Sequence, residues 1–361
     1  MLAHLRAVII LTLILTSTAH AEAFRFRAPL ADKLNADDAK LVTIYSAIDI
    51  GVARPLIAAF QAAHPETEVA YHDLQTVDLF ERILKETDEN KPTADLAISS
   101  AMDLQMKLAN DGYAQAYPVN GSSALPSWSV WRDEAYGITF EPAVLVYHKP
   151  SFPDGPPPKS RAELMTLLEK RDPALFGRIA TYDVERSGLG LLFLARDARH
   201  SDTIWRLIRL FGENGVKLYS SSNAIIDHVA NGRFALGYNL LGSYAAARAA
   251  QNPDLGVALL EDYTVVMSRI ALIPKAAANP AAGAQFLSFI LSGEGQKTLT
   301  EKMYMSALSS SVSGPNTAVA LRQKLGQRLR PIRIGPGLLV YLDRIKRRKL
   351  LHSWNRALGG R

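Results

Sequence analysis

Apolar residues recur along the chain at two alternating spacings, and the alternation predicts a series of β-α units. Residues 41–46 form a β-rich run that ends in small polar residues, which is typical of a buried strand. Apolar residues then recur at helical spacing from Val52 to Phe60, until His64 and Pro65 end the helix. The same order repeats, with strands expected at 67–72 and 94–99 and helices at 77–86 and 102–110.

A second series of the same kind follows a Pro-rich segment at 150–158. Its strands are expected at 178–182, 216–219 and 234–238, and its helices at 160–170, 189–198, 202–211, 223–230 and 244–250. Two further helices are expected near the end, at 281–291 and 295–304. Alternation of this kind predicts an α/β fold in which each lobe is a doubly wound, mainly parallel sheet with helices on both faces.

Two long apolar segments, 135–149 and 264–274, are expected to connect the lobes. Pro142 interrupts the first, and a proline suits a bend between lobes better than the middle of a strand. We therefore expect hinge crossings near Phe140 and Val266. The predicted boundaries are 41–140 with 265–361 for the first lobe and 141–264 for the second. In open α/β sheets a ligand binds beyond the carboxyl ends of the strands, so both lobes should face a shared cleft.

The first 21 residues have the pattern of a cleavable secretory signal: Arg6, an apolar run, and Ala19-His20-Ala21 as the cleavage site. We expect a periplasmic, soluble product that begins near Glu22 with a polar leader up to residue 40. The chain contains no cysteine, which excludes a disulfide framework and a thiolate metal site. About 340 mature residues exceed the usual size of one core, which favours two lobes.

Charge is distributed unevenly along the chain. Residues 322–361 carry twelve Lys or Arg and one acid, a local balance of +11, which leaves about −6 for residues 22–321. Residues 331–361 also have the spacing of an amphipathic helix. We expect this tail to pack against the first lobe, with a surface for an acidic partner or anionic lipid as the alternative. Export argues against a nucleic-acid partner.

Several segments together resemble a known family. They include LVTIYSAID, ADLAISSAMDLQMKLANDGYAQAY, AYGITFEPAVLVYHK, ERSGLGLLF, FALGYNLLGSYAAA and VMSRIALIPKAAANPAAGAQFLSFILSGEGQKTL. Over about residues 41–304 the chain is similar to periplasmic solute-binding proteins of the ferric-iron-binding type, and within them to the branch of the phosphoglycerate transport regulatory protein. The resemblance implies a two-lobed type II periplasmic fold, hinge closure on a small organic anion, and delivery to an ABC permease. Presentation to a sensor kinase is the alternative role.

Iron-binding members of this family hold the metal with a His in the first strand-to-helix turn and a Tyr-Tyr pair in the second lobe. Here the first turn contains Ser46 and Asp49 but no His, and the second motif contains Tyr238 followed by Asn239. Ferric iron prefers several hard anionic oxygen ligands. We therefore expect no metal and no cofactor, and iron binding remains an alternative.

Strand-end turns supply the ligand contacts that we expect. In the first lobe, hydroxyls and free N–H groups gather at helix starts, which favours an anion, although simple helix capping is the alternative. In the second lobe, an Arg beside a helix start suits bidentate carboxylate or phosphate binding, although an exposed loop arginine is nearly as common. The predicted contacts are Ser46, Ala47, Ser99, Ser100, Thr139, Arg186, Ser187, Gly188, Tyr238, Asn239 and Ser243.

Two residues near the expected contacts have other plausible roles. Tyr238 could equally be a core residue. Glu141 on the first crossing is expected to be a solvated hinge carboxylate, with contact to a ligand amine or pairing with Arg186 as the alternatives. Nucleophile-elbow, phosphate-loop and dinucleotide motifs are absent from the sequence, so we expect a binding protein, not an enzyme. We expect the protein to be a monomer.

Overall fold

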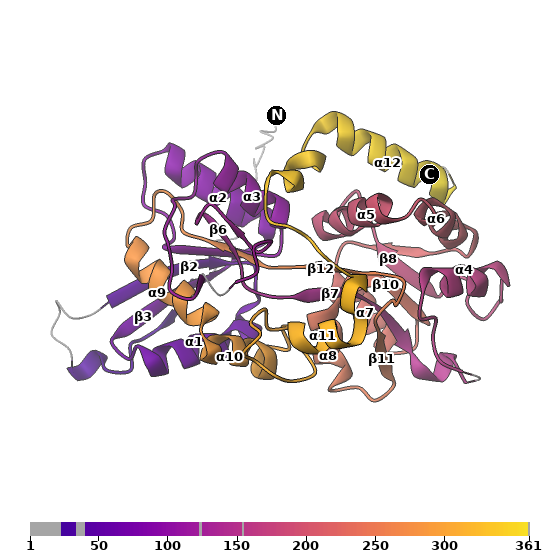
Figure 1. Cartoon of the computed structure of the whole chain (residues 1–361), viewed down its shortest axis with the longest axis horizontal. Helices are drawn as coiled ribbons and strands as arrows, with labels where there is room; N and C mark the ends of the chain where they lie inside the picture. The colour runs from indigo at the N-terminus through magenta and orange to yellow at the C-terminus, as the bar shows by residue number, and fades with distance from the viewer. Residues whose placement is uncertain (1–22, 34–39, 123–124, 154, 360–361) are drawn as a thin grey trace, which may run out of the picture.

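The computed structural model describes residues 23–33, 40–122, 125–153 and 155–359. The predicted secretory signal, 1–21, lies outside these residues. Two lobes stand side by side, each built on a β-sheet that is covered by helices (Figure 1). The expected two-lobed α/β fold is confirmed. Within the described residues, none of the helices combines the length and the apolar character that crossing a membrane requires.

The first sheet has seven strands in the order β1-β3-β2-β4-β13-β6-β5. Its bounds are β1 Ala23–Phe26, β2 Lys40–Ser46, β3 Thr67–Asp73, β4 Leu96–Ser99, β5 Val130–Trp131, β6 Ala135–Gly137 and β13 Ile270–Leu272. β3, β2 and β4 run parallel, and the other neighbours pair antiparallel. The sheet is thus mixed, and not mainly parallel as expected, because only β3, β2 and β4 belong to successive β-α units.

The second sheet has the order β14-β12-β7-β10-β8-β9, with β11 paired to β7. Its bounds are β7 Glu141–His148, β8 Ile179–Tyr182, β9 Lys217–Tyr219, β10 Leu236–Leu241, β11 Leu255–Ala258, β12 Thr264–Met267 and β14 Leu329–Pro331. β10, β8 and β9 run parallel, whereas β7 runs antiparallel to β10, β11 and β12.

Two extended segments connect the sheets, as expected. β6 belongs to the first sheet and β7 to the second, so the first crossing lies at 138–140. β12 belongs to the second sheet and β13 to the first, which places the second crossing at 268–269. Val266 therefore lies inside β12, and the expected boundary at 265 is three residues early, because the whole of TVVM pairs within the second sheet.

Helices cover both sheets, and their buried faces build the cores. The first lobe carries α1 Ile50–Ala63, α2 Thr76–Asp88, α3 Met102–Asn110, α9 Pro280–Leu291 and α10 Gly293–Met303, while the second carries α4 Arg161–Glu169, α5 Gly188–His200, α6 Ile204–Glu213, α7 Ser222–Ala230 and α8 Gly242–Ala249. Phe60 and Phe286 anchor one core, and Phe211 and Leu236 the other. The remaining helices, α11 Ala318–Leu325 and α12 Arg344–Leu358, belong to the C-terminal segment.

The C-terminal segment contacts both lobes, which corrects its expected packing against the first lobe. β14 extends the second sheet, and the short 3-10 helix η5, Pro336–Tyr341, then packs on α3 of the first lobe. α12 crosses back and lies on α6 of the second lobe (Figure 1). Its apolar stripe, Leu350, Trp354 and Leu358, joins the core of that lobe because these side chains recur every four residues on one face.

The start of the expected polar leader is also structured. Residues 23–26 form β1, which pairs antiparallel with β3. Phe24 and Phe26 are half-buried against the core of the first lobe, because their alternate spacing places both on one face of the strand. A 3-10 turn, η1 Ala31–Lys33, follows. Two other short 3-10 turns, η3 Lys149–Ser151 and η4 Gly326–Arg328, lie in connections.

Candidate functional site

The first lobe presents two strand-to-helix turns at one edge of its sheet. β2 ends at Ser46 and β4 at Ser99, and the parallel register places Ser46 opposite Ile98. The backbone N–H of Ala47 donates to the carbonyl oxygen of Ile98 over 2.9 Å. The structure therefore brings Ser46, Ala47, Ser99 and Ser100 together, at the edge where the parallel strands end.

The two buried serine hydroxyls at this edge accept local hydrogen bonds. Ser46 Oγ accepts from the N–H of Ile48, and Ser99 Oγ accepts from the N–H of Ala101, each over 3.1 Å. A hydroxyl that accepts still holds one hydrogen to donate. Local capping, the alternative that the sequence leaves open, is thus compatible with a further contact.

A buried ion pair lies beside these turns. β13 places Ile270 opposite Ser99, so the preceding residue, Arg269, lies where the second crossing meets the strand ends. Arg269 Nε donates to Glu141 Oε1 over 3.0 Å, and both side chains are 0% exposed. Glu141, expected to be a solvated hinge carboxylate, is instead fully buried because Arg269 neutralises it and two hydroxyl groups donate hydrogen bonds to it.

The two hydroxyl donors come from the first crossing and from the second lobe. Thr139 Oγ1 donates to Glu141 Oε1 over 2.9 Å, and Ser243 Oγ donates to Glu141 Oε2. Thr139 Oγ1 also accepts from the backbone N–H of Arg269 over 2.9 Å. The Glu141 carboxylate is therefore satisfied within the protein, and its role here is to hold Arg269 in place. Thr139 and Ser243, both expected at the site, line this cluster.

The terminal nitrogens of Arg269 have a different environment. Nη1 and Nη2 are buried, and neither finds a hydrogen-bond partner among the described residues. Burial acts to lower the pKa of Arg269, but Glu141 and Tyr244 outweigh it and raise the pKa above its ordinary value. The group is therefore a permanent cation with two terminal nitrogens, and so four N–H groups, without an acceptor among the described residues. Buried donors without partners are costly, which favours a site that a ligand completes.

The second lobe closes this cluster from the other side through the start of α8. A Cβ built at Gly242 would lie only 2.7 Å from the carbonyl oxygen of Pro142, so α8 approaches the start of β7 closely. The guanidinium carbon of Arg269 lies 5.5 Å from the centre of the Tyr244 ring. Arg269 is therefore fully buried between parts of both lobes.

The turn between β8 and α5 is a separate part of the second lobe. Arg186 is exposed, and within the described part of the chain it makes no ion pair or side-chain hydrogen bond. Ser187 Oγ accepts from the N–H of Gly190 over 3.1 Å and caps α5, whose first residue is the exposed Gly188. These three expected contacts thus lie at the start of α5, and no hydrogen bond links them to Arg269.

Tyr238 and Asn239 are directed into the core of the second lobe. β10 continues to Leu241 through a register shift between Gly237 and Leu240, and Asn239 adopts a positive φ of 60° at this bulge. The strand therefore does not end at Tyr238, as expected. The bulge turns both side chains toward Asp197 Oδ2, which accepts from Tyr238 over 2.9 Å and from Asn239 over 2.6 Å.

An internal network surrounds that aspartate. Arg161 Nη2 donates to Asp197 Oδ1 over 3.0 Å, Arg161 Nε donates to the Tyr238 hydroxyl over 2.8 Å, and the Tyr263 hydroxyl donates to Asp197 Oδ1 over 2.9 Å. Burial, and the charge of Asp197, raise the pKa of the Tyr238 phenol well above its ordinary value. Tyr238 thus remains a neutral structural phenol. Among the described residues, no group of three or more His, Cys, Asp or Glu side chains could hold a metal ion.

Sequence reasoning missed Arg269. The signal was present in the second crossing, where a single basic residue interrupts the apolar run TVVMSRIALIP. A charge inside such a run is either paired or placed against a ligand, because a buried charge alone is very costly. Only the fold reveals that its partner is Glu141 of the other crossing.

Comparisons with known proteins agree with this architecture. The family model for bacterial extracellular solute-binding proteins matches residues 55–320. A crystal structure of the substrate-binding protein of an ABC transporter from Agrobacterium tumefaciens is 49% identical, with a TM-score of 0.85, over 95% of this chain and 100% of that one. No curated protein matches the chain.

More distant structures share the fold. Iron-bound HitA from Pseudomonas aeruginosa is 18% identical, with a TM-score of 0.69, over 89% of this chain and 99% of that one. AfuA from Actinobacillus pleuropneumoniae, with fructose-6-phosphate bound, is 18% identical, with a TM-score of 0.70, over 88% and 98%. The family and these neighbours are binding proteins, not enzymes, as expected, whereas the narrower resemblance to the phosphoglycerate branch stays a prediction. The chain belongs to the bacterial extracellular solute-binding proteins and is an ABC-transporter solute-binding protein that works outside the cytoplasm.

Proposed function

We propose that this protein captures a small anionic solute, an organic acid or a phosphate ester, between its lobes and delivers it to an ABC permease. The observation that carries the proposal is the pair of free, buried terminal nitrogens of Arg269, fixed by Glu141. A guanidinium presents parallel N–H groups that match a carboxylate or phosphate in bidentate geometry. The ligand would supply the hydrogen-bond acceptors that Nη1 and Nη2 lack among the described residues.

Donor groups around Arg269 support an anionic ligand. Arg269 and Glu141 neutralise each other, and nearby α3 and α8 begin at this cluster with the partial positive charge of helix starts. The hydroxyls of Ser46 and Ser99 add donors. Arg186, at the start of α5, would add a second cation from the other lobe if closure brings it to the ligand.

One structural neighbour supports a phosphate ester as the ligand. AfuA was crystallised with fructose-6-phosphate, so the shared fold accommodates such a ligand in that protein. Iron-bound HitA supports ferric iron as the alternative ligand. In this chain the Tyr238 hydroxyl, which would be a metal ligand by resemblance, donates to Asp197 inside the second lobe. This contact favours an organic anion over iron.

Ligand entry would require the lobes to rotate about the two crossings at 138–140 and 268–269. Because Arg269 is fully buried, such an opening would expose the cluster to a ligand. Small-angle scattering tests this motion. A radius of gyration that falls when a tightly bound ligand is added would support closure, and an unchanged radius would contradict it.

A thermal-shift screen of organic acids, phosphate esters and ferric salts tests the ligand class. A ligand at 100 times its dissociation constant adds about 2.7 kcal/mol to the free energy of unfolding. We expect the largest shift from an organic anion, and we expect R269Q to abolish it. If R269Q kept the thermal shift, Arg269 would not be the residue that binds the ligand. If only ferric salts caused a shift, the ligand would not be an organic anion.

R186A is the matched second-lobe variant in the same screen. A partial loss of the shift would support the predicted contacts at Arg186, Ser187 and Gly188, and an unchanged shift would exclude Arg186. Delivery to a permease is favoured over presentation to a sensor kinase, because the 49% identical neighbour is the substrate-binding protein of an ABC transporter. Permease and ATPase genes beside this gene would support that role, and a lone kinase-regulator pair would contradict it.

A further inference from the structure

Helix α12 carries a basic stripe that the ligand site does not use. Its buried residues, Leu350, Trp354 and Leu358, face α6. At 100° per residue, the opposite side of the helix contains an outward stripe. The members of the stripe are Ile345, Arg348, Lys349, His352 and Arg356, and each is exposed.

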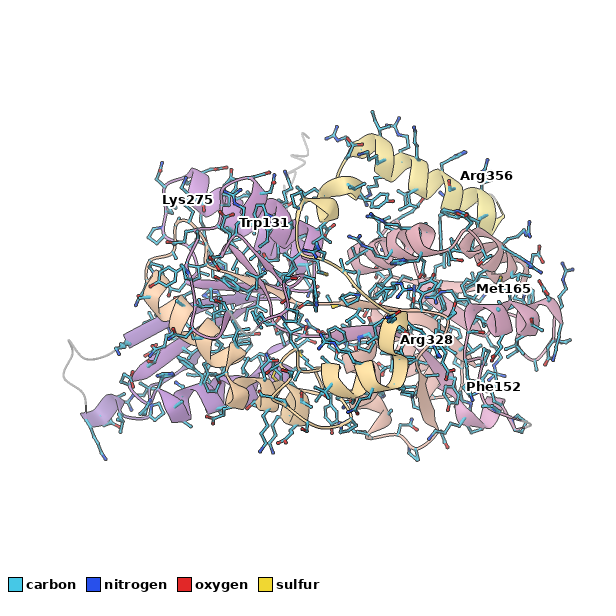
Figure 2. The ribbon with its side chains drawn as sticks, in the orientation of Figure 1. Trp131, Phe152, Met165, Lys275, Arg328 and Arg356 are labelled. Carbon is cyan, nitrogen blue, oxygen red and sulfur yellow. The ribbon has the colours of Figure 1, made fainter. Side chains whose placement is uncertain are left out.

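The orientation of this stripe is fixed by packing on the second lobe. Trp354 is buried in the core, and a Cβ at Gly212 of α6 would lie 2.2 Å from the carbonyl oxygen of Leu358, so the two helices are in close contact. Asp343 caps the start of α12 by accepting from the N–H groups of Ile345 and Lys346. Figure 2 shows Arg356 on α12 at the periphery of the molecule.

The cations of the stripe lack acidic partners. Within the described ranges, none of the ion pairs involves a residue of α12. Elsewhere exposed arginines do pair, as Arg171 does with Glu213 over 2.9 Å. The body of the chain is mildly acidic, whereas residues 322–361 carry +11, so unpaired positive charge is concentrated on this one segment.

We propose that α12 docks the protein on an anionic phospholipid surface. Its stripe is a convex ridge of one charge sign, about 22 Å long from fifteen residues, which suits a flat, uniformly negative plane. Ile345 is 66% exposed among Arg344, Lys346 and Arg348, the highest exposure of any large apolar residue in the described chain. An exposed apolar residue flanked by cations is typical of helices that bind at the lipid headgroup level.

An acidic protein segment is the competing partner. A hollow between α6 and α12, lined by Trp205, Arg209 and Arg356 among others, could accept such a segment. This hollow lies beside the stripe and would not bury Ile345 or Lys349. A lipid surface would engage both residues, and we therefore favour it. Docking through α12 would hold the second lobe at the membrane and leave the first lobe free to rotate.

Vesicle co-sedimentation of the mature protein tests this proposal. The probes are vesicles of phosphatidylglycerol with phosphatidylcholine and vesicles of phosphatidylcholine alone. We expect binding only to the anionic vesicles, weakened at least tenfold between 0.1 M and 0.5 M salt because screening is stronger. The triple variant R348E/K349E/R356E should bind at least about 100-fold more weakly, since each basic residue near such a surface contributes about fivefold.

The matched control is K85E/K275E/K302E on the first lobe, which changes the net charge equally at exposed residues. We expect it to retain vesicle binding, and I345S to lose severalfold. If both triple variants lost vesicle binding equally, the binding would depend on net charge alone, and α12 would not be a dedicated membrane-binding surface. Absence of vesicle binding would also refute the proposal, and binding of an acidic peptide in its place, lost in the α12 variant alone, would assign the stripe to a protein partner.

Discussion

Arg269 Nε donates to Glu141 Oε1 over 3.0 Å, and this contact joins the two chain crossings where they pass between the lobes. Glu141 is the first residue of β7 and directly follows the first crossing, and Arg269 lies on the second crossing and directly precedes β13. The pair is thus both the connection between the hinge segments and the support of the proposed anion anchor. Ligand binding and lobe movement would therefore act on the same two side chains.

Replacing Glu141 by Gln should destabilise the protein by about 3–5 kcal/mol, because a buried Arg269 would lose its counter-charge. Urea unfolding at pH 7 measures this free energy. The exposed pair of Arg171 and Glu213 provides the control, since E213Q should cost at most about 1 kcal/mol. Similar losses in the two variants would show that the buried pair has no special role.

The β-α order and the crossings could be predicted from the sequence, because both depend on local periodicity. The runs 41–46 and 94–99 became β2 and β4 nearly as expected, and Pro142 marked the bend into β7. Glu141 and Arg269 could not be paired in this way, because 128 positions separate them. Their contact depends on which strands become neighbours.

The position of Tyr238 could not be predicted from the sequence either. The apolar run at 234–238 and the polar Asn239 together indicate a strand end, yet β10 continues to Leu241 through a bulge. The bulge requires Asn239 at a positive φ, a conformation that Asn tolerates but that periodicity does not reveal. As a result, Tyr238 lies in the core and not in the cleft.

Replacing Asp197 by Ala should cost about 3–5 kcal/mol and leave ligand affinity unchanged. Asp197 accepts hydrogen bonds from Tyr238, Asn239, Tyr263 and Arg161, so its loss would leave Arg161 with only the exposed Asp262 as counter-charge. Urea unfolding and the ligand-induced thermal shift measure the two effects separately. If D197A lost as much ligand affinity as R269Q, Tyr238 and Asn239 would be ligand contacts after all.

Replacing Gly212 by Ala should separate α12 from the second lobe, because the added Cβ would lie 2.2 Å from the carbonyl oxygen of Leu358. We expect a lower melting temperature and faster proteolysis at the end of the chain. W354A should act in the same direction, with a cost of about 3–5 kcal/mol for a buried aromatic residue. G293A is the control, since a Cβ there would meet nothing within 4 Å. Equal behaviour of G212A and G293A would mean that α12 is not held at this contact.

His72 predicts a pH dependence of stability. Burial, and next the charge of Arg82, lower the pKa of His72 below its ordinary value. Arg82 Nη1 lies 3.3 Å from His72 Nδ1, and the His72 ring packs edge-on against Tyr45 with 5.0 Å between ring centres. The folded protein therefore resists protonation at this ring.

The sign of the effect follows from that resistance. Below the pKa of the unfolded state, about 6.5, the unfolded chain binds a proton that the folded protein does not, so stability falls as the pH decreases. Urea unfolding at pH 7.5 and pH 5.0 should show a smaller decrease in H72Q than in the unsubstituted protein. H352Q, at an exposed position on α12, should leave the decrease unchanged. If H72Q and the unsubstituted protein lost equal free energy, another group would carry the acid sensitivity.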